Sequence, residues 1–326
     1  MRRTIDVGTE QPLLDLTSYA RRGPADRVHL APEEIQLLSR TVRRTPEVMV
    51  KVLTMGGGDL KAVSRHLGYL SRDGEVEIET DDGRRLSGQG VEQELLEDWD
   101  LDLDEVRRTR DLRSRPGILR PKLVHKVVFS MPAGTPPDGL LRGTQAFARE
   151  TFGAKHRYAM VLHTDEPHPH VHMVIKAVSE EGVRLNIRKA TLREWRREFA
   201  RHLRAQGISA NATDKAVRGT TRANLSDGMY RARRRDASRR MLEQVGSPGV
   251  ERQAGEASSR ASLLHTRAEV ERGWMAAAEI LDHQDQPDLA WYVRRFVETL
   301  PPVRSDRELL RQVSTPRERG RQEPQL

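Results

Sequence analysis

The sequence predicts an α+β fold with further helices toward its C-terminal end. Segments rich in β-branched and apolar residues alternate with amphipathic helical patterns, which is typical of a sheet with flanking helices. Two pairs of these segments are joined by short turns, so their strands should run antiparallel as hairpins. The predicted strands cover residues 48–53, 75–80, 84–87, 123–129, 157–163, 170–178 and 183–187.

The N-terminal part contains an arm and then the first helices. Residues 1–44 are expected to form a mobile arm with a short helix opened by Pro32, because residues 1–30 show no sustained periodicity. After the first strand, Asp59 is placed to cap a helix that reaches about Arg72. The apolar stripe of this helix should face the core. It consists of Leu60, Val63, Leu67 and Leu70.

Three later segments are read from their charge and capping residues. The acidic stretch 92–105 is expected to be a solvated helix or connector, or to pair with a basic face nearby. Asp138 should cap a helix that ends at Gly153. Thr191 and Glu194 have the spacing of a capping box, which predicts a strongly basic helix over 191–206. The segment 183–187 between these helices should be a short edge strand.

The C-terminal part is read as helical and basic. Residues 223–300 are predicted to form a basic helical accessory region, with helices over 262–300. The aromatic residues Trp274, Trp291 and Phe296 are the expected packing anchors of those helices. Residues 301–326 are rich in Arg, Gln, Glu and Pro, so we expect a disordered tail.

Composition limits the classes of protein to which the chain can belong. Its 326 residues contain no cysteine, which excludes disulfides and thiolate metal sites. No apolar run approaches the ~20 residues that a membrane-spanning helix needs, and no signal-peptide pattern follows Met1, so we expect a cytoplasmic location. The formal net charge of +8 favours a polyanionic partner such as nucleic acid. Aromatic residues make up only 4% of the chain, which argues against an extended base-stacking surface.

The stretch from His163 to His172 concentrates metal-competent side chains in one predicted hairpin. Side chains alternate along a strand, so His170 and His172 should point to the same face, with His163 beside them on the paired strand. Three imidazoles with an open fourth position form a site for a divalent metal. Asp165 could hold one ligand imidazole in its correct tautomer. Two alternatives remain, namely solvated turn histidines or a closed structural zinc site completed by His168.

Tyr69 is the candidate nucleophile. It lies off the apolar stripe of its helix, so the core does not require it. Arg65 and Arg72 are its neighbours at i−4 and i+3 on the exposed face and should draw anions toward it. The alternative is a surface tyrosine between two solubilising arginines.

The other four tyrosines fit this role less well. Tyr158 should face away from the histidines because an odd number of residues separates it from His163. Tyr19 has no predicted scaffold, and Tyr292 belongs to an apolar cluster in which core packing is the simpler account. Tyr230, beside an arginine run over 231–240, is the serious rival.

Two segments together resemble the relaxase or mobilisation nucleases of conjugative plasmids and integrative elements, which belong to the His-hydrophobe-His endonuclease superfamily. They are His66-Leu-Gly-Tyr-Leu-Ser-Arg-Asp-Gly74 and His163-Thr-Asp-Glu-Pro-His-Pro-His-Val-His172. The segment 211–219 is also similar to the basic end of such domains. The resemblance covers residues 45–222 and implies a nuclease domain built on an antiparallel sheet of about five strands with flanking helices.

The resemblance also implies roles and partners. Tyr69 would attack a phosphodiester of single-stranded DNA at a transfer origin, leaving a 5′-phosphotyrosine and a free 3′-hydroxyl. The three histidines would hold a divalent metal ion (Mg or Mn, with Zn as a further option), and Asp165 would be the carboxylate beside them. Accessory relaxosome proteins and a type IV secretion coupling protein are the implied protein partners. The expected phosphate contacts come from Arg65, Arg72, Arg193, Arg196 and Arg197, and from the run 231–240.

Three other functions are compatible with the same residues. A replication initiator or a transposase of the same superfamily would use identical chemistry. A hydrolytic nuclease would use metal-bound water as the nucleophile. A non-catalytic basic DNA-binding protein with a structural metal site would need no exposed tyrosine beside the metal.

Overall fold

The computed structural model describes residues 4–5, 14–21, 29–53, 58–114, 121–220 and 250–303. The chain divides into two compact units. The sheet unit comprises Met1–Leu13 and Arg44–Ala212, and the helical unit comprises Leu14–Arg43 and Thr213–Leu326. Tyr230 and the predicted arginine run 231–240 lie outside the described residues, as does the tail beyond residue 303.

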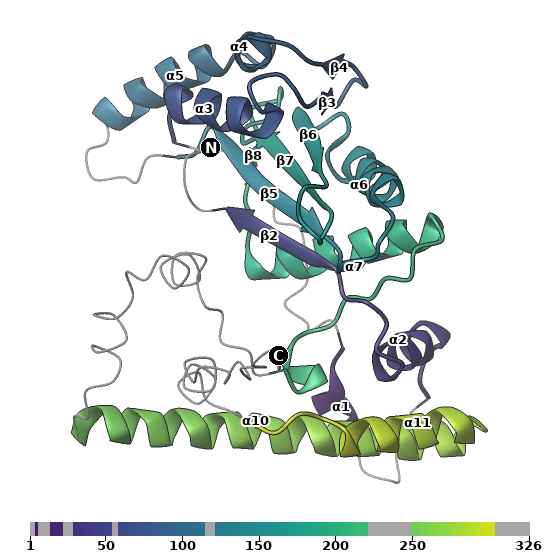
Figure 1. The fold of residues 1–326 in the computed structure, drawn as a ribbon. Coiled ribbons are helices and arrows are strands. Elements are labelled where there is room, and N and C mark those ends of the chain that lie inside the picture. The colour runs from purple at the N-terminus through teal and green to yellow at the C-terminus, as the bar shows by residue number, and fades with distance from the viewer. Residues whose placement is uncertain are drawn as a thin grey trace, which may run out of the picture. The chain divides into compact units, whose positions relative to one another are not determined.

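The sheet unit is built on one antiparallel sheet, which confirms the predicted α+β class (Figure 1). The sheet has six strands where about five were expected, because both short strands of the 75–87 hairpin join it through β3. In spatial order the strands are β2 (Met49–Leu53), β5 (Val124–Ser130), β7 (His170–Lys176), β6 (Tyr158–His163), β3 (Ile78–Thr80) and β4 (Arg85–Leu86).

Each face of the sheet has its own hydrophobic core. The first face presents Val127, Phe129 and Met173, and α6 (Pro137–Phe152) and α7 (Lys189–Ala205) cover it. The second face presents Val161 and Val174, which pack with residues of α3 (Leu60–Ser71) and α4 (Val91–Asp98). Figure 1 shows α3 and α4 on the opposite side of the sheet from α6 and α7. The histidines of β7 alternate with its core residues on the first face, so they lie on the second face.

Helix α3 begins and ends close to where the sequence predicts. The side chain of Asp59 caps it by accepting a hydrogen bond from the Ala62 amide at 2.7 Å, as expected. Its last turn ends because Arg72 adopts the left-handed conformation, with φ of 51°. Asp73 and Gly74 also have positive φ. The residue after Ser71 therefore leaves the helix, and Arg72 is a cap rather than a member of the helical face.

Two predicted helix starts are wrong by a few residues. Helix α7 begins at Lys189 instead of Thr191, and the Thr191 hydroxyl accepts a hydrogen bond from the Arg188 amide at 3.2 Å from inside the first turn. Helix α6 begins at Pro137, one residue before the predicted cap Asp138. Proline fits the first helical position because it has no amide hydrogen to satisfy.

The acidic stretch is helical but only partly solvated. It forms α4 and the start of α5 (Leu101–Ser114), and Trp99 and Leu101 between the two helices are buried in the core. Its carboxylate Asp98 forms ion pairs with Arg84 at 2.8 Å and with Arg157 at 2.7 Å. The stretch therefore closes one edge of the second core.

The segment 183–187 is not an edge strand of the large sheet. Its residues Arg184–Leu185 form β8, which pairs in parallel with β1 (Thr4–Ile5). After β7 the chain turns at Gly182 and folds back on itself, and the Leu185 amide donates to the Ala177 carbonyl at 2.9 Å. This contact lies beyond the last residue of β7 that pairs within the sheet.

The helical unit joins residues 14–43 to the C-terminal helices. Its elements are α1 (Leu16–Arg21), α2 (Pro32–Val42), the short 3-10 helix η1 (Ala216–Arg218), α10 (Val250–His283) and α11 (Pro287–Glu298). Trp274 and Phe296 are buried as predicted, whereas Trp291 is 58% exposed and does not anchor the core. Residues 14–21 and 29–43 share this core, so they are more than an arm ahead of the sheet unit.

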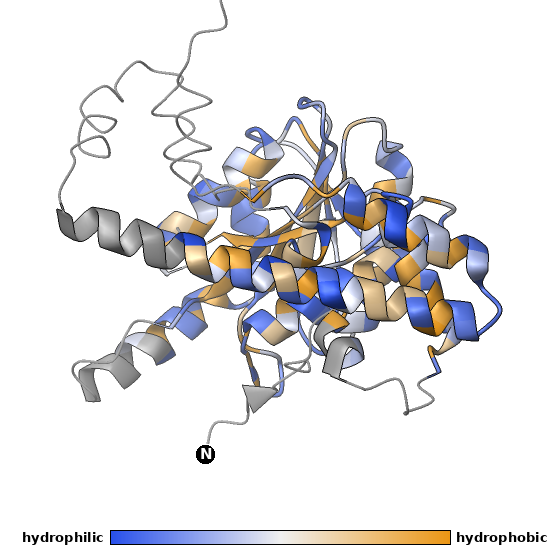
Figure 2. Cartoon of the chain, turned by 90° about the horizontal axis from the view of Figure 1, so that it is seen from below, coloured by the Kyte–Doolittle hydropathy of each residue, from blue (hydrophilic) through white to orange (hydrophobic). Residues whose placement is uncertain are grey.

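Hydropathy follows this architecture. Figure 2 shows hydrophobic residues along the strands and mixed hydrophobic and hydrophilic residues along the helices. None of the helices in the described ranges carries an apolar stretch that could span a bilayer.

Candidate metal centre

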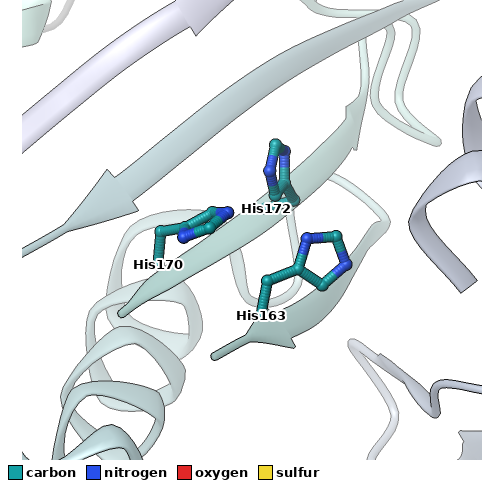
Figure 3. A group of neighbouring side chains, drawn as sticks. All are labelled: His163, His170 and His172. Carbon is teal, nitrogen blue, oxygen red and sulfur yellow. The ribbon is translucent and has the colours of Figure 1, made fainter. Parts of the chain in front are cut away.

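Three histidines converge where the hairpin of β6 and β7 ends. His163 is directly opposite His170 in the antiparallel register, and His172 is two residues further along β7 on the same face. The ring centroids are 5.4 Å apart for His163 and His170, 5.0 Å for His163 and His172, and 5.1 Å for His170 and His172. One nitrogen from each ring lies within 4.8 Å of the others. Figure 3 shows the three rings gathered on the two strands.

Main-chain carbonyls orient two of the rings. Nε2 of His163 donates to the Leu70 carbonyl at 2.9 Å, and Nδ1 of His170 donates to the His168 carbonyl at 3.0 Å. A carbonyl can only accept, so these bonds place a proton on Nε2 of His163 and on Nδ1 of His170. In a neutral ring, the nitrogen that could bind a metal is then Nδ1 of His163 and Nε2 of His170. The Leu70 carbonyl belongs to the last turn of α3, which ties this ligand to the helix that carries Tyr69.

His172 is held neutral by its surroundings. Its pKa is lowered to about 3, chiefly by burial and to a smaller extent by the nearby His163, His170 and His66. Imidazole binds a metal through an unprotonated nitrogen. A donor set of three convergent imidazoles fits a divalent metal with room for further ligands.

His168 and Asp165 take positions that the sequence does not predict. Nδ1 of His168 accepts from the Ala133 amide at 3.0 Å, and this residue does not join the three-histidine cluster. Asp165 pairs with Arg72 at 2.9 Å, and no imidazole is its hydrogen-bond partner in the described chain. Its own backbone amide and then Arg72 lower the pKa of this carboxyl. Backbone carbonyls, rather than Asp165, therefore set the ligand tautomers.

Tyr69 lies near the end of α3 on its solvent side, with 71% of its surface exposed. Its ring stacks on His66 at a centroid distance of 6.5 Å, and His66 meets the edge of His172 at 6.5 Å. Arg65 is also exposed, and none of the ion pairs of the described residues involves it. The structure thus brings the candidate nucleophile and the candidate metal ligands to the same end of α3.

His66 links these groups, although the sequence assigns it no role. Its Nε2 is enclosed and has no hydrogen-bond partner within the described chain. The pKa of His66 is lowered to about 4, chiefly by burial and to a smaller extent by the charge of Lys126. The signal that could have identified His66 is its helical spacing of three residues from Tyr69.

The other described tyrosines are placed elsewhere. Tyr158 is buried in the core on the first face, as predicted, and burial raises its pKa to about 12. Tyr19 is buried in the helical unit and donates to Glu34 at 2.8 Å. Tyr292 is 40% exposed with Arg43 above its ring, so the expectation that it packs in the core is wrong.

The basic helix α7 is not beside the histidines. Its Trp195 and Phe199 pack on the first face of the sheet, whereas the histidines occupy the second face. Arg196 pairs with Glu47 at 3.7 Å, and Arg197 pairs with Glu194 at 2.9 Å. The sheet therefore separates Arg193, Arg196 and Arg197 from Tyr69 and the metal ligands, because their helix packs on the other side.

A second group of possible ligands lies on the first face. Glu150, Glu198 and His202 come together between α6 and α7. The Arg201 guanidinium bonds to both carboxylates, at 2.5 Å to Glu150 and 2.6 Å to Glu198. This cluster is therefore an ion-pair network that already contains its cation.

Comparison with known proteins agrees with this geometry. Residues 69–208 match the family model described as "Relaxase: MobA/VirD2-like, nuclease domain". The chain is 24% identical to the T-DNA border endonuclease VirD2 of Agrobacterium fabrum over 209 residues, which are 60% of this chain and 46% of that protein. It is 24% identical over 201 residues to VirD2 of Rhizobium radiobacter, which are 57% of this chain and 46% of that protein.

The VirD2 of Rhizobium rhizogenes is 22% identical over 217 residues, covering 59% of this chain and 46% of that protein. The chain thus spans about half the length of the curated relatives it matches. The matched region contains the exposed Tyr69 and all three convergent histidines. Residues 69–208 are thus similar to the nuclease domain of the MobA/VirD2-like relaxases.

Proposed function

We propose that this chain nicks and rejoins single-stranded DNA at a transfer origin and so starts the mobilisation of a plasmid or integrative element. The observation that carries the proposal is the convergence of three imidazoles next to the helix end that presents Tyr69. The match to the relaxase family model and the similarity to T-DNA border endonucleases support the same reaction class.

Tyr69 is the proposed nucleophile. Its phenolic oxygen attacks the phosphorus of one phosphodiester, and the bond from phosphorus to the 3′ oxygen breaks. The phenol loses its proton, and the departing 3′ oxygen gains one to become a hydroxyl. The 5′ end stays on the enzyme as a phosphotyrosine, which preserves the bond energy for rejoining without a nucleotide cofactor.

His163, His170 and His172 are proposed to hold a divalent ion, Mg or Mn, with Zn as a further option. When bound, such an ion would act as a Lewis acid that neutralises charge on a phosphodiester oxygen. The hydrogen bonds from His163 to Leu70 and from His170 to the His168 carbonyl keep the ligand nitrogens aimed inward.

Asp165 and Arg72 are proposed as positioning residues. Their ion pair joins the loop after β6 to the cap of α3, three residues beyond Tyr69. Arg65 is the proposed phosphate contact on the same helix, because it is exposed and close to Tyr69 in helical spacing.

The wider assignments are proposals too. Residues 45–222 would be the nuclease domain, and 223–300 the basic accessory region. A cytoplasmic location, accessory relaxosome proteins and a type IV secretion coupling protein would fit DNA transfer.

The test is an adduct assay with labelled single-stranded DNA from the transfer origin of the same element. The wild-type chain with Mg or Mn should give a protein–DNA band that survives denaturant, and Tyr69→Phe should give none while still binding DNA. Tyr158→Phe is the matched control and should retain the adduct. Cleavage without any adduct would instead indicate a hydrolytic nuclease. DNA binding without cleavage would indicate a non-catalytic protein.

A further inference from the structure

Two buried lysines lie on the face of the sheet that carries the histidines, and they differ in one respect. Lys126 of β5 and Lys176 of β7 are each 4% exposed. The Lys176 ammonium has two carboxylate partners, Glu180 at 3.1 Å and Asp104 at 3.9 Å. Within the described part of the chain, Lys126 makes neither an ion pair nor a hydrogen bond. A largely buried cation without a protein partner is unfavourable, so an anion bound from outside would stabilise it.

The register places Lys126 beside the metal ligands. Lys126 is opposite Val174 of β7, and the neighbouring row holds Val128 opposite His172. Lys126 is therefore diagonal to His172, and diagonal positions of an antiparallel pair are about 7–8 Å apart. On the next strand, Lys51 of β2 is opposite Val128 and extends the basic character of this face to the sheet edge.

The charged groups around Lys126 do not neutralise it. Asp59 attracts it weakly, but the carboxylate of Asp59 is committed to the cap of α3. The pKa of Lys126 is lowered to about 8, chiefly by burial and to a smaller extent by Lys122. His66 on the helix above is neutral because its own pKa is lowered. Lys126 therefore remains mostly protonated at pH 7.

The ammonium can still reach a ligand. The enclosed, unpartnered polar atoms of the described residues include Nε2 of His66 but not Nζ of Lys126. The hydrocarbon stem of Lys126 is thus covered, while its charged end retains access to solvent. A phosphate oxygen is the anion that the proposed substrate would bring to this place.

We propose that Lys126 is a phosphate-binding residue, and that it takes the phosphodiester next to the one held at the three histidines. The proposal rests on the proposed function, because the substrate supplies the missing anion. Lys126 acts in binding, and the step at Tyr69 does not use it. Lys126 is diagonal to His172 in the sheet register. A phosphate contact at Lys126 therefore fixes which phosphodiester of the DNA strand lies over the three histidines.

The experiment measures binding of a fluorescent dT 25-mer to the full chain in chelator, at 50 to 200 mM salt, with Lys126→Met, Lys126→Gln and the control Lys176→Met. We expect both Lys126 variants to bind roughly tenfold more weakly and to reduce the salt slope by about 0.7, the value for one phosphate contact on a single strand. Lys126→Arg should restore the slope. Lys176→Met should leave the slope unchanged.

Stability separates a binding role from a structural one. Removing an unpaired buried charge should leave the melting temperature equal or higher in Lys126→Met and Lys126→Gln, whereas Lys176→Met should lower it by stranding Asp104 and Glu180. An unchanged salt slope in the Lys126 variants, or a loss of stability as large as that of Lys176→Met, would overturn the proposal. Failure of the wild-type chain to bind the 25-mer would instead overturn the proposed function.

Discussion

His125 should make the sheet unit sensitive to acid. It lies on β5, and its Nε2 donates to the Leu185 carbonyl at 3.2 Å. Burial lowers its pKa from 6.5 to about 4, with smaller contributions from Lys122, Arg184 and His156, while the bond to Leu185 opposes the shift. The folded chain therefore resists protonation of this ring, whereas the unfolded chain accepts a proton below pH 6.5.

The sign and size of the effect follow from linkage. Stability from His125 is fully present above pH 6.5 and is lost as the pH falls toward 4, because only the unfolded state binds the proton in that window. Each pKa unit corresponds to ~1.36 kcal/mol, so the full loss is about 3 kcal/mol and the loss at pH 5 is about 2 kcal/mol. Domains are stable by only ~5–15 kcal/mol, so this is a measurable fraction.

The assay is urea unfolding of the metal-free chain at pH 7 and pH 5. His125→Gln removes the titrating group but can still donate to the Leu185 carbonyl. Between pH 7 and pH 5 its free energy of unfolding should therefore fall by about 2 kcal/mol less than that of wild type. In the control His168→Gln, which replaces an exposed histidine, the free energy of unfolding should fall as much as in wild type. If His125→Gln and wild type lose the same free energy of unfolding, burial does not keep His125 neutral and the reasoning is refuted.

Two further predictions concern the turn after Tyr69 and the metal ligands. Gly74→Ala should destabilise the fold by about 3 kcal/mol, because φ is +94° and the added carbon would lie 2.0 Å from the Gly88 carbonyl oxygen. The control Gly83→Ala, at φ +83° with open space, should cost about 1 kcal/mol in urea unfolding, and equal losses would contradict this account. A divalent ion at 100 times its Kd should stabilise wild type by about 2.7 kcal/mol in calorimetry, and His170→Ala but not His168→Ala should abolish this gain.

Local patterns predict much of the fold and the convergence of the three histidines. The alternation of side chains along β7 places His170 and His172 on one face without knowledge of any distant contact. The cap at Asp59 is equally local, since its side chain bonds three residues ahead. The side-chain alternation and the helix cap depend only on residues that are close in sequence, and both occur in the structure where the pattern predicts them.

Contacts between distant segments account for the differences. The carbonyl of Leu70 orients His163 from 93 residues away, and sequence spacing cannot reveal such a partner. Arg72 pairs with Asp165 because a left-handed cap redirects it out of the helical face. Lys126 is inconspicuous in an apolar strand until the register shows that it shares a face with the histidines.

The central claim is that Tyr69 is the group that becomes bonded to DNA. The most direct test is proteolytic digestion of the covalent adduct followed by mass spectrometry of the nucleotide-bearing peptide. The account predicts one modified peptide containing Tyr69, with the nucleotide joined through its 5′ phosphate and a free 3′-hydroxyl on the other cleavage product. A nucleotide found on Tyr230 or on any other residue would contradict it.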